Sequence, residues 1–194
     1  MKNKLSSNVV KKMLRDCNIP LDPFAKPYDL DIYFAKRHWE SGYESGHGYD
    51  GIRREYYEDQ GEMIDFLFEF LKSIDASRCI IAPFGNYSYF KNWSDIHEND
   101  IYRIMKSYLK EANIRTNSQF GMELDIFNES DVLKAFIEGG FRYISQAVFL
   151  FPEHCFTVEP HHHMNYMINM SEHSVSKEKI KEVVSRYASL ATAL

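Results

Sequence analysis

The stretch from residue 141 to residue 170 constrains the fold of this chain more than any other. Its sequence, FRYISQAVFLFPEHCFTVEPHHHMNYMINM, is rich in the aromatic and β-branched residues that favour strands. Pro152 and Pro160 interrupt it, because each proline fixes one backbone angle and removes a hydrogen-bond donor. The predicted strands are 141–151, 155–159 and 164–170. Three strands in succession predict the centre of a largely antiparallel sheet.

Hydrophobic periodicity predicts the elements outside this stretch. The predicted helices run from Ser6 or Ser7 to Cys17, from Glu62 to Ile74, from Asp95 to Ala112, from Asn128 to Glu138 ahead of Gly139-Gly140, and from Ser174 or Ser176 to Leu194. Further strands are predicted over Leu30 to Ala35, Arg78 to Phe84 and Gln119 to Phe127, with a short edge strand over Ile52 to Tyr57. These elements favour the α+β class, with about five helices on the sheet.

Composition limits the domain organisation and the partners. The 194 residues are 44% hydrophobic and 15% aromatic, and no low-complexity linker divides them, so we expect one domain over residues 1–194. The net charge of −5 argues against nucleic acid and anionic membranes as partners. The chain has neither a signal-peptide pattern nor 18 consecutive apolar residues, which predicts a soluble cytoplasmic protein.

The three cysteines, Cys17, Cys79 and Cys155, are widely spaced and form no CxxC pair. This spacing predicts neither a disulfide framework nor a zinc knuckle. His154 and Cys155 are neighbours in a predicted strand and would point to opposite faces, so His154 is poorly placed to activate Cys155, and a buried inert thiol is expected. Patterns such as GxSxG, the P-loop, GxGxxG and HExxH do not occur, and no cofactor is predicted.

An acidic, tyrosine-rich segment is the first candidate site. Between Glu40 and Asp65, eight carboxylates accompany only two arginines, and four glycines favour an exposed loop in the first half. Aromatic side chains beside fixed charge are typical of protein interfaces. The candidate contact residues are Trp39, Glu40, Tyr43, Glu44, Tyr49, Asp50, Glu55, Tyr56, Tyr57, Glu58 and Asp59. The alternative is a solvated acidic loop whose tyrosines cover the core.

This segment leads to the first functional hypothesis, a non-catalytic domain that binds a basic protein. An immunity protein or antitoxin that neutralises a toxin nuclease has this character: it is small, acidic and without catalytic motifs. Replacing Glu55, Glu58 and Asp59 by lysine would then abolish binding, because the attraction to a basic partner is electrostatic.

The histidines near the end of the stretch are the second candidate site. If residues 159–163 are extended, Glu159, His161 and His163 project from one face and His162 from the other, so two imidazoles and a carboxylate could hold one metal ion. A metal-binding protein or metal-dependent hydrolase that uses these residues, with His154, is the alternative hypothesis. The same histidines are also compatible with a solvated hairpin turn.

Overall fold

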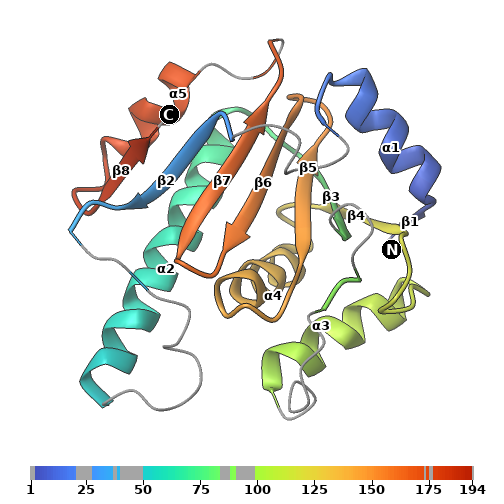
Figure 1. Cartoon of the computed structure of the whole chain (residues 1–194), viewed down its shortest axis with the longest axis horizontal. Coiled ribbons are helices and arrows are strands. Elements are labelled where there is room, and N and C mark those ends of the chain that lie inside the picture. The colour runs from blue at the N-terminus through green and yellow to red at the C-terminus, as the bar shows by residue number, and fades with distance from the viewer. Residues whose placement is uncertain are drawn as a thin grey trace.

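One sheet unites elements from both ends of the chain. The computed structural model describes residues 3–20, 28–36, 39, 50–83, 88–90, 99–172, 174 and 177–193, with residues 50–53 described by their backbone alone. Within these residues, eight strands follow the order β1-β4-β3-β5-β6-β7-β2-β8, and every neighbouring pair is antiparallel (Figure 1). The predicted α+β class is therefore confirmed.

Residues 147–170 of the stretch that was expected to form the centre of the sheet do so as a meander, β5-β6-β7. The predicted start of the first strand at Phe141 is wrong, because Phe141 ends a helix and the strand begins at Ala147. The strands are β1 (Asn3–Leu5), β2 (Leu30–Phe34), β3 (Arg78–Pro83), β4 (Gly121–Asp125), β5 (Ala147–Phe151), β6 (Phe156–His161), β7 (Asn165–Met170) and β8 (Leu190–Ala193). The helices are α1 (Ser7–Asp16), α2 (Asp50–Ser73), α3 (Asp100–Glu111), α4 (Ser130–Phe141) and α5 (Lys177–Val184). None of them, within the described residues, is long and apolar enough to cross a membrane.

The two faces of the sheet are covered unequally. Ile81 of β3 belongs to the large core shared with α2 and α4, whereas Ile80 and Ala82 pack in a smaller cluster with α1. Alternation along a strand explains the division, since successive side chains point to opposite faces. In Figure 1, α2 and α4 lie behind the sheet, and α1 lies to the right of β5. Over β6, β7 and β2, one face of the sheet carries His161, Asn165 and Asp31 together with Met167.

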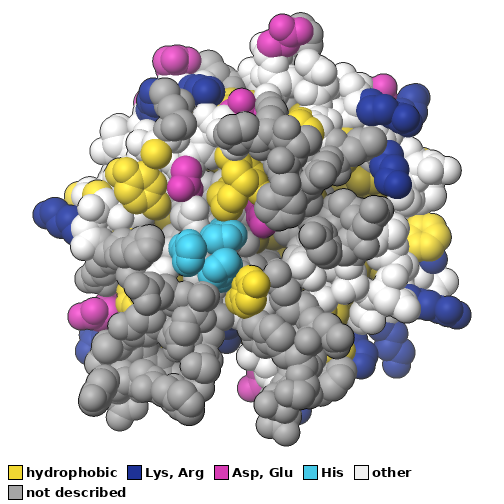
Figure 2. Space-filling view, in the orientation of Figure 1, with side chains coloured by type: hydrophobic (Ala, Val, Ile, Leu, Met, Phe, Trp, Pro, Cys, Tyr) yellow, Lys and Arg dark blue, Asp and Glu magenta, His cyan; other side chains and the backbone are white. Residues whose placement is uncertain are grey.

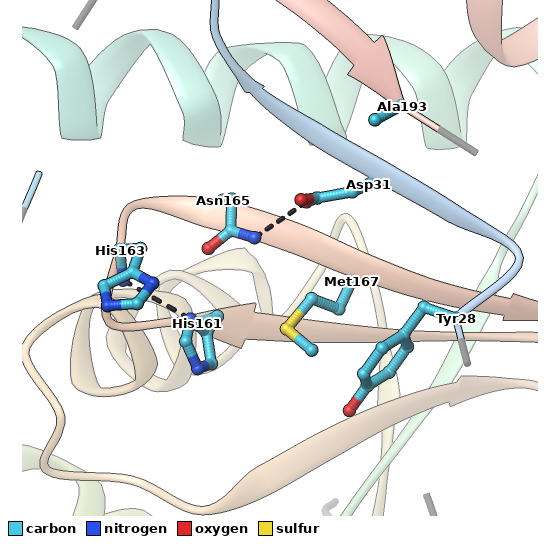
Figure 3. Close-up of a pocket in the computed structure, with 7 residues that line it drawn as sticks. All are labelled: Tyr28, Asp31, His161, His163, Asn165, Met167 and Ala193. Atoms are coloured by element: carbon cyan, nitrogen blue, oxygen red, sulfur yellow. Dashed lines mark hydrogen bonds between the residues drawn. The ribbon is translucent and has the colours of Figure 1, made fainter. Parts of the chain in front are cut away.

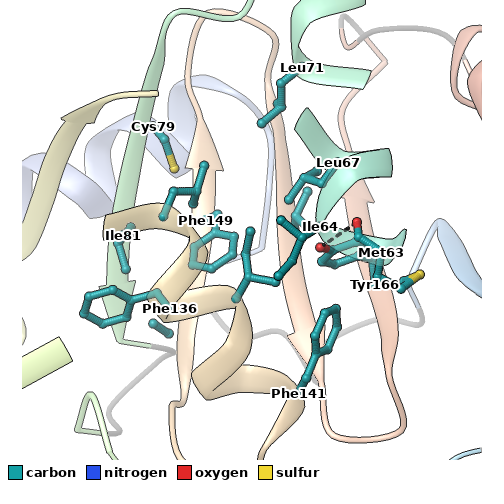
Figure 4. Close-up of a cluster of buried hydrophobic side chains, with 14 of the residues drawn as sticks. Met63, Ile64, Leu67, Leu71, Cys79, Ile81, Phe136, Phe141, Phe149 and Tyr166 are labelled. Carbon is teal, nitrogen blue, oxygen red and sulfur yellow. Dashed lines mark hydrogen bonds between the residues drawn. The ribbon is translucent and has the colours of Figure 1, made fainter. Parts of the chain in front are cut away.

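The large core is built on α2, as Figure 4 shows. Met63, Phe66, Leu67 and Phe70 are fully or almost fully buried, and they recur at the three- and four-residue spacing of one helix face. The hydroxyl of Tyr166 on β7 donates to the carbonyl oxygen of Met63 at 3.1 Å, which satisfies the only polar atom of a fully buried ring.

The edge strand predicted over Ile52 to Tyr57 is wrong, because α2 begins at Asp50. Tyr56 is buried and lies seven residues before Met63, so the apolar stripe of the helix extends further towards the N-terminus than the aliphatic run suggests. Residues 40–49, which were predicted to be an exposed loop, lie outside the described residues.

The predicted end of α4 is also wrong. The helix continues through Gly139 and Gly140 to Phe141, and its N-cap is Glu129 rather than Asn128. Both glycines lie where the helix touches a neighbour: an added Cβ would meet Met105 at position 139 and Pro160 at position 140. Their function here is close packing and not termination of the helix.

The last predicted helix is shorter than expected. It ends at Val184, and residues 190–193 form β8, which pairs with β2 along the edge of the sheet. A short apolar run is compatible with either element, and only the long-range pairing decides between them.

The predicted break at Pro160 is likewise wrong, because β6 includes Pro160 and ends at His161. The cap of α3 is Asn99, whereas the predicted Asp95 lies outside the described residues.

Candidate metal centre

A tight turn at the end of β6 brings three histidines together. His161 pairs with Asn165 across the hairpin, so His162, His163 and Met164 form the loop between β6 and β7. The backbone N–H of Met164 donates to the carbonyl oxygen of His161 at 2.9 Å, and Met164 has a positive φ of 55°. A three-residue hairpin loop that ends in a left-handed residue has this geometry. We call His161, His162 and His163 the histidine turn.

The three imidazole rings of the histidine turn converge. Their centroids are 3.9 Å apart for His161 and His162, 4.3 Å for His162 and His163, and 4.8 Å for His161 and His163. One nitrogen from each ring lies within 4.8 Å of the others. The prediction that His162 would face away is therefore wrong, because the chain turns at this point instead of remaining extended. Figure 2 shows the histidines as one compact group on this face.

Helix α4 supports the histidine turn from behind. The ring centroid of Tyr143, just beyond the end of α4, lies 4.4 Å from the ring centroid of His162. Gly140 contacts Pro160, the residue that precedes His161, so closely that no Cβ would fit. The position of the turn therefore depends on how closely α4 approaches β6.

A buried amide and a carboxylate lie beside the imidazoles. The Asn165 side-chain nitrogen donates to Asp31 Oδ1 at 2.7 Å, whereas Asn165 Oδ1 is buried and accepts no hydrogen bond from any residue that the structure describes. Asn165 itself is only 8% exposed. Figure 3 shows the amide nitrogen directed to Asp31 and the oxygen on the side of His163. The oxygen is thus available to a bound ion, a water molecule or an imidazole N–H.

Asp31 adds negative charge next to the turn. Burial raises the pKa of its carboxyl above the usual range, and the hydrogen bond from Asn165, the backbone N–H of Ile32 and the charge of His163 act in the opposite direction. The carboxyl group is thus held in a partly desolvated place close to His163, where a positive charge would stabilise its ionised form.

A cavity of about 400 Å³ opens from the histidine turn across the polar face of the sheet. Tyr28, Asp31, His161, His163, Asn165, Met167 and Ala193 line it (Figure 3). These residues come from β6, β7, β2 and β8, from the loop between β6 and β7, and from the chain just before β2. The cavity is large enough for a small molecule or several waters beside the imidazoles.

The other two predicted ligands do not join the group. His154 lies in the turn before β6, at the opposite end of that strand from His161. Glu159 precedes His161 by two residues, but its carboxylate accepts a hydrogen bond of 2.5 Å from the Tyr28 hydroxyl and is not among the converging ligand atoms. Burial, followed by the charge of Glu159, raises the pKa of Tyr28 well above its usual range, so the phenol remains a donor. The side chains that could hold a metal ion are therefore His161, His162 and His163. Glu159, which was predicted to be a ligand with His161 and His163, is replaced by His162.

The acidic candidate surface is only partly a surface. Trp39, Tyr56 and Asp59 are buried, and the Trp39 indole N–H donates to Asp59 Oδ2 at 2.9 Å. These three side chains stabilise the packing of α2 and are not available to a partner. Among the described side chains of the predicted set, the exposed ones are Glu55, Tyr57 and Glu58. Glu40, Tyr43, Glu44, Tyr49 and the side chain of Asp50 lie outside the described residues.

Sequence reasoning missed Asp31 and Asn165. Asn165 and Asn169 alternate with apolar residues in β7, and this pattern signals a polar face of the sheet. Asp31 has no such signal, because it reaches the site through the pairing of β2 with β7, more than 130 residues apart in sequence.

In comparisons with known proteins, the chain matched no family model, and no curated protein or solved structure was significantly similar to it.

Proposed function

We propose that this protein binds a divalent transition-metal ion through the histidine turn. The observation that carries the proposal is the convergence of one nitrogen from each of three consecutive imidazoles to within 4.8 Å. Neutral imidazole is a common ligand of zinc, copper and nickel, whereas magnesium and calcium prefer oxygen ligands. A chain without CxxC pairs could still bind zinc with three imidazoles and one further ligand.

Asn165 and Asp31 support the proposal. A buried carbonyl oxygen without a donor destabilises a fold by about 1–3 kcal/mol, so Asn165 Oδ1 is better explained if something binds there. Histidine ligands usually donate their second N–H to a carbonyl or carboxylate, which fixes the orientation of the ring. Asn165 and Asp31 provide one group of each kind beside the turn.

The cavity favours a site with an open coordination position. Catalytic zinc sites combine three protein ligands with a water or substrate in the fourth position, whereas structural sites are closed. A bound zinc ion would supply a water with a pKa lowered to about 7, the nucleophile of metal-dependent hydrolysis. Hydrolysis of a small substrate in the cavity is therefore the reaction class that this arrangement favours.

Zinc titration of the untagged, metal-free full-length protein tests the proposal. We expect one ion per chain by isothermal titration calorimetry and no binding of magnesium. His161→Ala together with His163→Ala should weaken zinc binding by about 100-fold or more, because two ligands are lost, and Asn165→Ala should weaken it by about 10-fold. His154→Ala is the matched control, since it removes an imidazole at the other end of β6 and should leave the affinity unchanged.

The proposal fails if the double variant binds zinc as the wild type does while its circular dichroism is unchanged. Zinc binding that disappears in His154→Ala but persists in the double variant would place the ion elsewhere and contradict the histidine turn. Binding also requires neutral imidazole, so the affinity should fall on acidification, with protons released on binding at neutral pH.

The protein-binding hypothesis remains a second proposal with a smaller surface. Glu55, Tyr57 and Glu58 are exposed near the start of α2, where Arg54 Nε donates to Glu58 Oε1 at 2.8 Å and the two side chains form an ion pair. This turn of the helix could steer a basic protein such as a toxin nuclease. Asp59 is no longer a useful position for charge reversal, because its replacement would remove the acceptor of the buried Trp39.

Charge reversal on α2 tests this second proposal. Glu55→Lys with Glu58→Lys should abolish capture of a basic protein from cell extract, because the charge that attracts the partner is reversed. The capture is done at low ionic strength, since salt at 0.1 M screens this attraction over about 10 Å. Glu111→Lys with Glu178→Lys changes the net charge equally at exposed positions on α3 and α5 and should leave capture intact. Equal capture by both double variants would show that α2 is not the interface.

A further inference from the structure

Two cysteines that are distant in sequence meet at the end of α1. Cys17 is the C-cap residue of α1, and Cys155 lies in the turn between β5 and β6 with a positive φ of 50°. Both thiols donate to the same acceptor, the carbonyl oxygen of Pro152, at 3.8 Å from Cys17 and 3.7 Å from Cys155. In Figure 1 this turn lies beside α1. The two sulfur atoms therefore share one small space, and a hydrogen bond between the two thiols brings Cys17 and Cys155 into direct contact.

The surroundings of the two thiols differ. Cys17 is 5% exposed and belongs to the smaller cluster under α1, with Val10, Ile80 and Leu150, whereas Cys155 is half-buried at the edge of that cluster. Burial first, and then the hydrogen bond with Cys155, raises the pKa of Cys17 to about 12. Cys155 is therefore the thiol that an external reagent reaches first. The third cysteine, Cys79, is fully buried in the large core.

We propose that Cys17 and Cys155 form a reversible disulfide that fastens the end of α1 to the β5–β6 turn, with a small-molecule disulfide as the oxidant. The inference is independent of the metal centre, which lies at the other end of β6. Disulfides in reducing compartments are usually transient and redox-sensing, and a pair with one half-buried and one buried sulfur fits that class.

The exchange proceeds in two displacements. The Cys155 thiolate attacks one sulfur of the small disulfide, the S–S bond breaks, and one small thiolate leaves with the electron pair and is protonated. The Cys17 thiolate then attacks the Cys155 sulfur and displaces the second small thiolate. Two protein thiols are thereby oxidised and one small disulfide is reduced to two thiols. The second step is slow, because the raised pKa of Cys17 keeps most of it protonated.

The disulfide would add a covalent bond to the non-covalent contacts that hold α1 against the sheet. In the reduced protein α1 is held by the apolar contacts of the smaller cluster and by its hydrogen bonds. Linking residues 17 and 155 closes a long loop of the unfolded chain, which favours the folded state. Oxidation should therefore raise the melting temperature by several degrees.

Peptide mapping of the wild-type protein decides the proposal. The reduced full-length chain is incubated with mixtures of oxidised and reduced glutathione, and its mass is measured after acid quenching. We expect a loss of two hydrogen atoms, a linked peptide pair that contains Cys17 and Cys155, and alkylation of Cys79 alone after unfolding. Three alkylated thiols, or Cys155 that ends as a stable glutathione adduct, would overturn the proposal.

Variants give a second measurement. Cys17→Ser should stop the reaction at the glutathione adduct of Cys155 and abolish the rise in melting temperature. Cys79→Ala is the matched control, because it removes a thiol outside the pair and should still show the linked peptides and the rise. A linked pair that contains Cys79 would contradict the assignment.

Discussion

Phe66→Ala is expected to lower the free energy of unfolding by about 4 kcal/mol, the value typical of deleting a fully buried aromatic ring. Phe66 has no exposed surface, and its ring centroid lies 6.4 Å from that of Phe70, 6.3 Å from Tyr166 and 5.7 Å from Tyr187. It therefore joins α2 to β7 and to the segment between α5 and β8. An alanine would leave a cavity that three rigid rings cannot close.

The neighbouring polar contacts limit how far the structure can relax. The Tyr187 hydroxyl donates to Glu69 Oε2 at 2.8 Å, and Arg186 donates to Glu69 Oε1 at 2.6 Å. These bonds hold Tyr187 in place, so its ring cannot move into the space of Phe66 without breaking them. Phe66→Leu keeps much of the volume and should cost only about 1.5 kcal/mol.

Urea unfolding at neutral pH measures both effects. Phe127→Ala is the control for the same chemical change at a site that is 47% exposed, and it should alter the free energy of unfolding by less than about 0.5 kcal/mol. If Phe66→Ala and Phe127→Ala were equally stable, α2 would not be the helix on which the core depends.

The parts of the fold that sequence predicts are those fixed by local chemistry. Ser6 caps α1 as predicted, by accepting a hydrogen bond from the Val9 N–H at 3.4 Å, and the β5-β6-β7 meander follows from its aromatic and β-branched residues. The errors occur where contacts between residues far apart in sequence determine the secondary structure. Residues 190–193 become a strand because β2 has a free side in the sheet, and α4 continues through two glycines because Met105 and Pro160 approach it closely.

The candidate site follows the same division. His161 and His163 could be named from sequence as a pair, because they are close along the chain. The inward position of His162 depends on the turn at Met164, and the contribution of Asp31 depends on the pairing of β2 with β7. In the acidic segment, charge and aromatic content do not reveal which side of a helix faces the core, so they did not predict the burial of Asp59 on α2. Trp39 lies outside that helix and is buried through its contacts with Tyr56 and Asp59.

Gly140→Ala is expected to destabilise the fold by about 3 kcal/mol and to weaken zinc binding as well. An added Cβ would lie 2.5 Å from Pro160 Cγ and 2.6 Å from the Pro160 carbonyl oxygen. Alanine normally stabilises a helix relative to glycine by about 1 kcal/mol, but a clash with a rigid ring and a backbone atom outweighs that gain. Helix α4 must then move away from β6.

Two other glycines provide graded controls. At Gly139 the added Cβ would meet the flexible end of Met105, with Sδ at 2.5 Å, so the side chain can shift and the destabilisation should be smaller. At Gly61, inside α2, no atom of the described residues lies within 4 Å, so alanine should stabilise the protein by about 0.5–1 kcal/mol. The expected order of stability is Gly61→Ala, wild type, Gly139→Ala, Gly140→Ala.

Zinc titration of the same three variants distinguishes an effect on stability from an effect on the geometry of the histidine turn. Because Tyr143 contacts His162 just beyond the end of α4, a displaced α4 withdraws support from the histidine turn, and Gly140→Ala should lose zinc affinity at a temperature where it is still folded. Gly61→Ala should retain the wild-type affinity. A Gly140→Ala protein that is destabilised but binds zinc normally would show that the hairpin loop alone positions the imidazoles, since its hydrogen bond from Met164 to His161 needs no contribution from α4.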